Sequence, residues 1–175
     1  MIIDTHIHIC DERYDSDREE MLLSAALNGV KKFINIGAEI NENKRVINYQ
    51  KEGVYKAIGL HPHYIQQLND NEFLEIKGYL KNTKDIVAIG EIGLDFYKNE
   101  TPAEKQKEVF KKFLQLSKEF DLPVIIHSRE AHNEVFNLLK EFNINKKELY
   151  IVLQAILRQQ KSLLILDIIL ALAGL

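Results

Sequence analysis

The sequence predicts one α/β domain built around a parallel sheet. Short apolar segments that read as strands alternate with longer segments of helical periodicity. The strand segments are continuously apolar, which is typical of parallel strands covered on both faces. Most histidines fall where these strands end. These three observations leave two candidates, an open doubly wound sheet and a (β/α)8 barrel.

The elements follow one another in strict strand-helix order. Strands are expected over residues 1–9, 31–37, 54–63, 85–95, 122–128 and 148–156. Helices are expected over residues 16–30, 41–52, 70–82, 101–120 and 129–142.

Two of these helices begin with capping signals. Ser16 and Glu19 have the spacing of a capping box, and Thr101 and Glu104 repeat it with Pro102 in the first turn. The helix at 101–120 also has the clearest apolar stripe. Its expected core residues are Val109, Phe110, Phe113, Leu114 and Leu116.

Composition argues against several classes of protein, but it leaves open a nuclease that grips a short stretch of phosphate. The chain has 175 residues, is 46% hydrophobic and carries a net charge of -3, so it lacks the basic excess of most nucleic-acid-binding domains. Cys10 is the single cysteine, which favours a reducing compartment. No signal peptide is recognised, and the apolar run at 162–175 is shorter than the ~20 residues of a membrane span. We expect a cytoplasmic protein without a membrane partner.

Polar side chains gather at the carboxyl ends of the predicted strands, the face that carries active sites in barrels and open α/β sheets. They are His6, His8, His61, His63, Glu91, Asp95, His127 and Arg129. Residues i and i+2 of a strand point the same way, so His6 and His8 can present two imidazoles to one metal ion. A single strand-end histidine is usually structural, but the joint pattern with Glu91 and His127 favours a metal centre.

Four stretches of the sequence match a known family. "DTHIH", "GLHPH", "AIGEIGLDFY" and "PAEKQKEVFKKFLQLSKEFDLPVIIHSREA" occur in this order. Together they resemble the TatD family of metal-dependent hydrolases and deoxyribonucleases over about residues 1–150. The resemblance implies a TIM-type (β/α)8 barrel with a divalent centre, often of two ions (Zn, Mg or Mn). It also implies cleavage of phosphodiester bonds in DNA, including 3′-5′ exonuclease activity.

The resemblance assigns roles to individual residues. The implied metal ligands are His6, His8, Glu91 and His127, with Glu91 bridging two ions and serving in catalysis. His61 and Asp95 are expected to place substrate or to support the ligands. Arg129 can form a bidentate contact with a phosphate, or an ion pair with an acid such as Glu130.

Three further residues are expected to have structural roles. His63 and His132 are predicted to be structural or solvent-facing. Cys10 is predicted to be a packed thiol rather than a nucleophile.

The last part of the sequence departs from the family pattern. A full barrel takes roughly 250 residues. The expected histidine of a His-Cys-Phe-Ser-Gly-like motif and the aspartate of a Glu-Thr-Asp-like motif are not seen, and Gln154 lies near the place of the histidine. We expect a partial barrel of about six βα units at 1–153 and an atypical apolar tail at 154–175. The tail can be encoded by codons that, when read one base out of step, encode a segment resembling the seventh strand of the family. A frameshift is therefore one hypothesis for the origin of the tail.

The sequence is consistent with three functions. The first is a TatD-type deoxyribonuclease acting on DNA or another phosphodiester. The second is an amidohydrolase-like enzyme for a small molecule, disfavoured because such enzymes usually place a carboxylated lysine where this chain has Glu91. The third is a non-catalytic remnant, favoured by the absent ligands. The sequence does not predict the oligomeric state.

Overall fold

The computed structural model describes residues 2–97, 100–144, 149–153 and 169–171. In these ranges seven parallel strands form one sheet in chain order, β1 to β7. The strands are β1 Ile2–Ile7, β2 Val30–Gly37, β3 Val54–Ile58, β4 Ile86–Asp95, β5 Val124–Arg129, β6 Leu149–Leu153 and β7 Ile169–Ala171.

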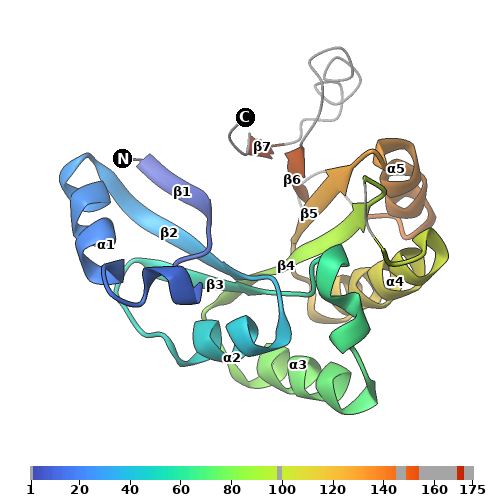
Figure 1. Ribbon diagram of the computed structural model, residues 1–175, viewed down its shortest axis with the longest axis horizontal. Helices are drawn as coiled ribbons and strands as arrows, with labels where there is room; N and C mark the ends of the chain where they lie inside the picture. Colours follow the sequence, from blue (N-terminus) through green and yellow to red (C-terminus); the bar gives the residue numbers. More distant parts are fainter. Residues whose placement is uncertain (1, 98–99, 145–148, 154–168, 172–175) are drawn as a thin grey trace.

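Five α-helices within the described ranges cover the convex side of this curled sheet (Figure 1). They are α1 Arg18–Leu27, α2 Ile40–Asn48, α3 Asp70–Asn82, α4 Ala103–Phe120 and α5 His132–Glu141. Two short 3-10 helices, η1 Glu12–Tyr14 and η2 Pro62–Gln67, follow β1 and β3. Sequential strand order with helices on one side is the arrangement of a barrel, whereas a doubly wound sheet reverses its order and has helices on both faces. The predicted TIM-type barrel is therefore confirmed, as a partly closed one.

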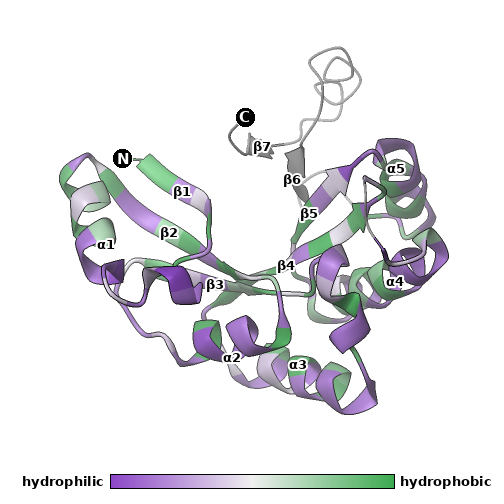
Figure 2. Cartoon of the chain, in the orientation of Figure 1, coloured by the Kyte–Doolittle hydropathy of each residue, from purple (hydrophilic) through white to green (hydrophobic). Residues whose placement is uncertain are grey.

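The core has two layers, one on each face of the sheet. The larger layer lies between the strands and the helices, where α4 inserts the fully buried Phe110, Phe113 and Leu114. A smaller cluster lies on the other face of the sheet and contains Ile36, Ala57, Ala88 and Ile125. Each helix from α2 to α5 carries both hydrophilic and hydrophobic residues (Figure 2). The apolar stripe predicted for α4 is buried as expected.

Both predicted capping boxes are wrong. Helix α1 begins after Asp17, which makes no side-chain cap, and Glu19 instead accepts hydrogen bonds from Tyr49 and Lys51. Helix α4 begins after Pro102, again without a side-chain cap. Glu19 therefore contacts residues that are distant in the sequence instead of capping the start of its own helix.

The third predicted strand is shorter than expected, and the fourth agrees with its predicted range. The third ends at Ile58, because Pro62 starts η2 and the side chain of His61 caps it by accepting a hydrogen bond from the His63 N–H. The fourth covers Ile86–Asp95, close to the predicted 85–95, so Glu91 lies inside this strand rather than at its carboxyl end. Pairing between β4 and β5 shifts register between Ile89 and Ile92, and a bulge of this kind re-aims the side chains within it.

The predicted tail at 154–175 lies mostly outside the described residues. Within it the structure describes β7, which pairs with β6. None of the helices in the described ranges has the length and apolarity of a membrane span. The cytoplasmic location stays a prediction.

Candidate metal centre

The two histidines of the opening segment face one point. His6 lies on β1 and His8 directly follows it, and their Nε2 atoms are 3.1 Å apart. The His6 N–H donates to Asp4 Oδ1, and the Nδ1 atom of His8 lies 3.0 Å from the Ile36 carbonyl oxygen. The ring of His8 is therefore held by β2 with its Nε2 toward His6.

Glu91 joins this pair from β4. Its Oε2 atom is 3.5 Å from Nε2 of His6 and 3.5 Å from Nε2 of His8. Its Oε1 atom lies 3.2 Å from Nδ1 of His127 on β5. The residue is only 5% exposed. One buried carboxylate thus presents a different oxygen to two groups of histidines.

These side chains form two groups whose ligand atoms all lie within 4.8 Å of one another. The first contains His6, His8 and Glu91, and the second contains His61, Glu91 and His127. Ligands at ~2.0–2.1 Å from a tetrahedral or octahedral ion lie about 2.8–3.4 Å apart, close to the 3.1 to 3.5 Å found in the first group. Imidazole nitrogens with a carboxylate suit zinc and manganese, so the residues fit a divalent cation.

The charges within the centre are strongly coupled. Burial opposes the charged form of Glu91, but hydrogen bonds from His127, His6 and His8 outweigh it and hold the pKa of this carboxyl well below its usual range. Burial also opposes protonation of His8, yet Glu42 and Glu91 raise the pKa of His8 to about 10. The centre therefore favours positive charge beside Glu91.

The two histidines of the second group differ in charge. Against the effect of burial, Asp95 and Glu91 raise the pKa of His127 to about 9. Burial, together with the positive His127 nearby, lowers the pKa of His61 to about 3. His61 is thus a neutral imidazole, the form that binds metals.

Asp95 supports the second group from the end of β4. It is fully buried, and its Oδ2 atom lies 3.0 Å from Nε2 of His127 and 2.9 Å from Nε2 of His63. Its Oδ1 atom accepts a hydrogen bond from the Tyr97 N–H. A carboxylate behind a ligand histidine fixes the ring and its tautomer. Sequence reasoning had placed His61 in this supporting role and left His63 aside, whereas the structure brings His61 into the ligand group and His63 against Asp95.

The remaining predicted residues have other partners. The guanidinium of Arg129 lies 4.0 Å from the ring centroid of Tyr97, a partner different from the predicted Glu130. His132 shares a 2.7 Å hydrogen bond with Ser128. Cys10 is buried beside Asn35, and burial raises the pKa of its thiol, which agrees with a packed cysteine.

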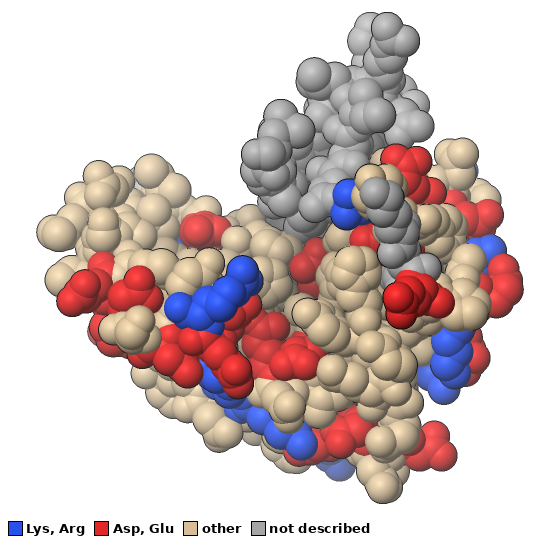
Figure 3. Space-filling model, in the orientation of Figure 1, with Lys and Arg blue, Asp and Glu red and all other residues tan. Residues whose placement is uncertain are grey.

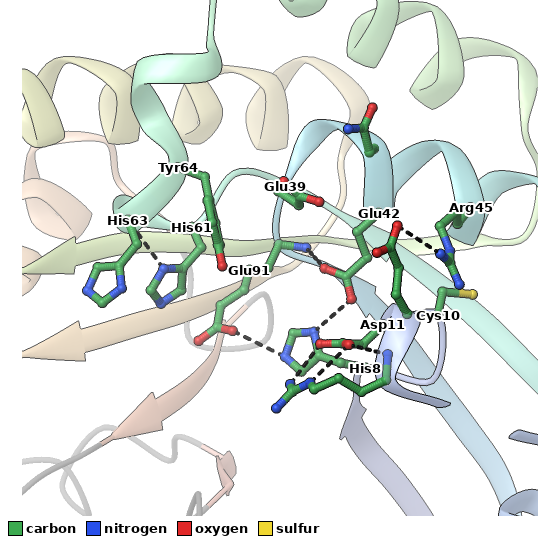
Figure 4. Close-up of a pocket in the computed structure, with 14 residues that line it drawn as sticks. His8, Cys10, Asp11, Glu39, Glu42, Arg45, His61, His63, Tyr64 and Glu91 are labelled. Atoms are coloured by element: carbon green, nitrogen blue, oxygen red, sulfur yellow. Dashed lines mark hydrogen bonds and ion pairs between the residues drawn. The ribbon is translucent and has the colours of Figure 1, made fainter. Parts of the chain in front are cut away.

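A cavity of about 450 Å³ opens beside Glu91 (Figure 4). Its lining includes His8, His61, Asp11, Arg13 and Tyr64. Arg13 is mostly committed to Asp11, with which it forms a two-pronged ion pair. On the face seen in Figure 3, Lys and Arg side chains are interspersed with Asp and Glu rather than gathered in one basic area. A phosphate would therefore depend on bound cations for attraction to this cavity.

Glu42 is a site residue that sequence reasoning missed. Its Oε1 atom lies 3.5 Å from Nδ1 of His8, and its Oε2 atom accepts a 2.7 Å hydrogen bond from the Ala38 N–H. It belongs to α2, within an ordinary polar helix segment, so no local signal marks it.

Comparison with known proteins gives consistent matches. The family model described as "TatD related DNase" matches residues 3–157. The "uncharacterized metal-dependent hydrolase YabD" of Bacillus subtilis is 37% identical over 143 residues, covering 81% of this chain and 56% of that protein. The "3'-5' ssDNA/RNA exonuclease TatD" of Cronobacter sakazakii is 35% identical over 141 residues, covering 79% of this chain and 53% of that protein. The chain thus spans about half the length of these curated relatives.

Solved structures agree with these matches. The TatD homologue YjjV of Escherichia coli superposes with a TM-score of 0.84 at 31% identity, covering 97% of this chain and 66% of that chain. A TatD family hydrolase of Entamoeba histolytica has a TM-score of 0.82 at 23% identity, covering 97% of this chain and 64% of that chain, and supports the fold alone.

Proposed function

The chain belongs to the TatD-related DNase family, and from that premise we propose that it hydrolyses phosphodiester bonds of nucleic acid with divalent cations. The observation that carries the proposal is the position of Glu91, whose Oε2 faces His6 and His8 while its Oε1 faces His127. A carboxylate that offers one oxygen to each of two groups is suited to bridge two ions.

The assignment of ligands follows from the two groups of side chains. His6, His8 and Glu91 would hold one cation, and His61, His127 and Glu91 would hold a second. When bound, two cations supply charge stabilisation for the phosphoryl oxygens and lower the pKa of a bound water. Zinc, manganese and magnesium are the candidate ions.

The chain's own groups orient the reaction. Asp95 fixes the ring of His127, and the Ile36 carbonyl fixes that of His8. Arg129, held over the ring of Tyr97, is the candidate for a bidentate contact with a phosphate. Each of these groups positions a ligand side chain or the phosphate. Positioning is the main contribution that a protein makes to displacement at phosphorus.

We also propose that the chain cleaves single-stranded nucleic acid from its end. A cavity of about 450 Å³ is within the size range of small-ligand sites and suits one nucleotide better than a duplex. The relatives named as 3'-5' ssDNA/RNA exonucleases support the same polarity. We therefore expect nucleotides to be removed singly from a 3′ end.

A labelled oligonucleotide tests the proposal. The 175-residue chain is incubated with a 5′-labelled single strand and magnesium, manganese or zinc, and the products are separated by length. Stepwise shortening that EDTA stops and Glu91→Ala abolishes is the expected result. Shortening that survives Glu91→Ala, or none with any of the three ions, contradicts the proposal. Cleavage confined to a lactone or amide panel would favour the amidohydrolase alternative.

A further inference from the structure

The Glu42 carboxylate lies behind the candidate metal centre, on the side of His8 away from the ligand atoms (Figure 4). It is largely buried, and its Oε1 atom has no hydrogen-bond partner within the described part of the chain. Burial of an unpartnered carboxylate oxygen is costly, unless a positive or polar group compensates it. The group that Oε1 faces is the Nδ1 side of His8, at 3.5 Å.

His8 can bind a cation through Nε2 only if the ring proton sits on Nδ1. The Ile36 carbonyl oxygen, 3.0 Å from Nδ1, accepts from that position and supplies the short contact. At 3.5 Å the Glu42 oxygen is too far for a strong hydrogen bond, so its contribution is negative charge on the Nδ1 side. Both acceptors favour a proton on Nδ1 and leave the Nε2 lone pair directed toward His6 and Glu91.

The second Glu42 oxygen is tied to the backbone that carries the other group. Oε2 accepts a 2.7 Å hydrogen bond from the Ala38 N–H. The Ala38 carbonyl oxygen in turn accepts a 2.9 Å hydrogen bond from the N–H of His61. A single carboxylate therefore touches His8 of the first group directly and is linked to His61 of the second through one residue.

We propose that Glu42 is a positioning residue that, together with the Ile36 carbonyl, favours the Nδ1–H tautomer of His8 and holds it in register with the loop carrying His61. This inference rests on the proposed function, because it assumes that His8 is a metal ligand. Loss of such an outer partner typically weakens metal binding by about 10–100-fold. Glu42 itself contacts neither the cation nor the substrate in this assignment.

Glu42→Gln separates positioning of the histidine from mere support of the loop. The glutamine keeps the volume and can still accept from Ala38 with its oxygen, but its NH₂ group then faces the Nδ1–H of His8, donor against donor. Turning the amide to relieve this clash gives up the bond to Ala38. We expect zinc affinity, measured by titration calorimetry, to fall about 10–100-fold while the metal-free melting temperature stays close to that of the unchanged chain.

Glu39→Gln is the matched control. It removes the same charge three residues earlier, where the carboxylate accepts from Gln67 instead of facing a histidine. We expect zinc affinity to stay within about threefold of that of the unchanged chain, since the charge lost lies away from His8. A loss equal to that of Glu42→Gln would show a general charge effect and overturn the inference.

A spectroscopic measurement follows the histidine directly. In the zinc-loaded, ¹⁵N-labelled chain, His8 is expected to show a protonated Nδ1 and a metal-bound Nε2, and this pattern should be lost or mixed in Glu42→Gln. Unchanged zinc affinity and an unchanged His8 signal in Glu42→Gln would refute the role of Glu42. Failure of the unchanged chain to bind zinc, manganese or magnesium would instead refute the proposed function, so the two failures are distinguishable.

Discussion

The Nε2 atoms of His6 and His8 lie 3.1 Å apart on the same face of the sheet. Two imidazole nitrogens this close repel each other through their lone pairs unless a proton or a cation lies between them. Glu91 Oε2, 3.5 Å from both, adds negative charge at the same point. The three atoms are therefore arranged as the ligands of a cation would be, and the effect of an added cation on stability tests this arrangement.

Zinc or manganese is expected to stabilise the fold, because a cation bound only by the folded state shifts the unfolding equilibrium. At 100 times the dissociation constant the gain is about 2.7 kcal/mol. For a chain of this size that corresponds to a melting temperature raised by about 5–11 °C. Differential scanning calorimetry with and without the ion, followed by EDTA, checks the shift and its reversal.

The His6→Ala, His8→Ala double variant serves as the control for this shift. It removes both imidazoles of the first group and keeps Glu91, so the stabilisation should fall well below that of the unchanged chain. A melting temperature that rises equally in both proteins would place the cation elsewhere.

Asp95→Asn should destabilise the metal-free chain. The carboxylate is buried and accepts hydrogen bonds from two histidines and from the Tyr97 N–H, and an amide cannot satisfy all three donors. We expect the free energy of unfolding to fall by about 1–3 kcal/mol, measured by urea denaturation in EDTA. Glu104→Gln, on the exposed side of α4, gives the background for a neutralised acid. Equal stability of the two variants would mean that Asp95 is not an important acceptor.

Phe113→Ala should lower the free energy of unfolding far more than a substitution of a surface residue does. Phe113 is fully buried between α4 and the sheet, and its ring lies 6.2 Å from that of Phe73 in an edge-to-face arrangement. Truncation of a buried phenylalanine leaves a cavity and costs about 3–5 kcal/mol. Urea denaturation again provides the measurement, with Leu27→Ala, an exposed leucine of α1, as the comparison. A loss below about 1 kcal/mol would mean that this layer repacks.

Much of this fold was predictable because its determinants are local. Helix α3 occupies the predicted range of 70–82, and continuous apolar strands indicated the parallel sheet. The meeting of His6 with His8 also follows from strand geometry alone, since alternate residues share a face. Sequential strand order, which separates a barrel from a doubly wound sheet, rested on the family resemblance and not on periodicity.

What the sequence did not predict depends on contacts between distant segments. Glu42 reaches His8 because β2 lies between them in the sheet and α2 returns along it. The partnership of His63 with Asp95 joins positions 32 residues apart. The spacing of residues along one element contains no information on either contact, so only the folded chain identifies Glu42 and His63 as neighbours of the centre.

Tyr64 is expected to contribute to the binding of nucleic acid. Tyr64 lines the cavity, the centroid of its ring lies 6.2 Å from that of His61, and the residue is 40% exposed, so it is accessible to a base. Stacking of a base on an aromatic ring is worth about 1–3 kcal/mol. Tyr64→Ala should therefore weaken binding of a phosphorothioate single strand, measured by fluorescence anisotropy with manganese present, by about 5–150-fold. Tyr64→Phe keeps the ring and should bind within about twofold of the unchanged chain, because stacking uses the ring face and not the hydroxyl. If both variants lose affinity equally, the hydroxyl is the binding group; if neither does, bases bind elsewhere.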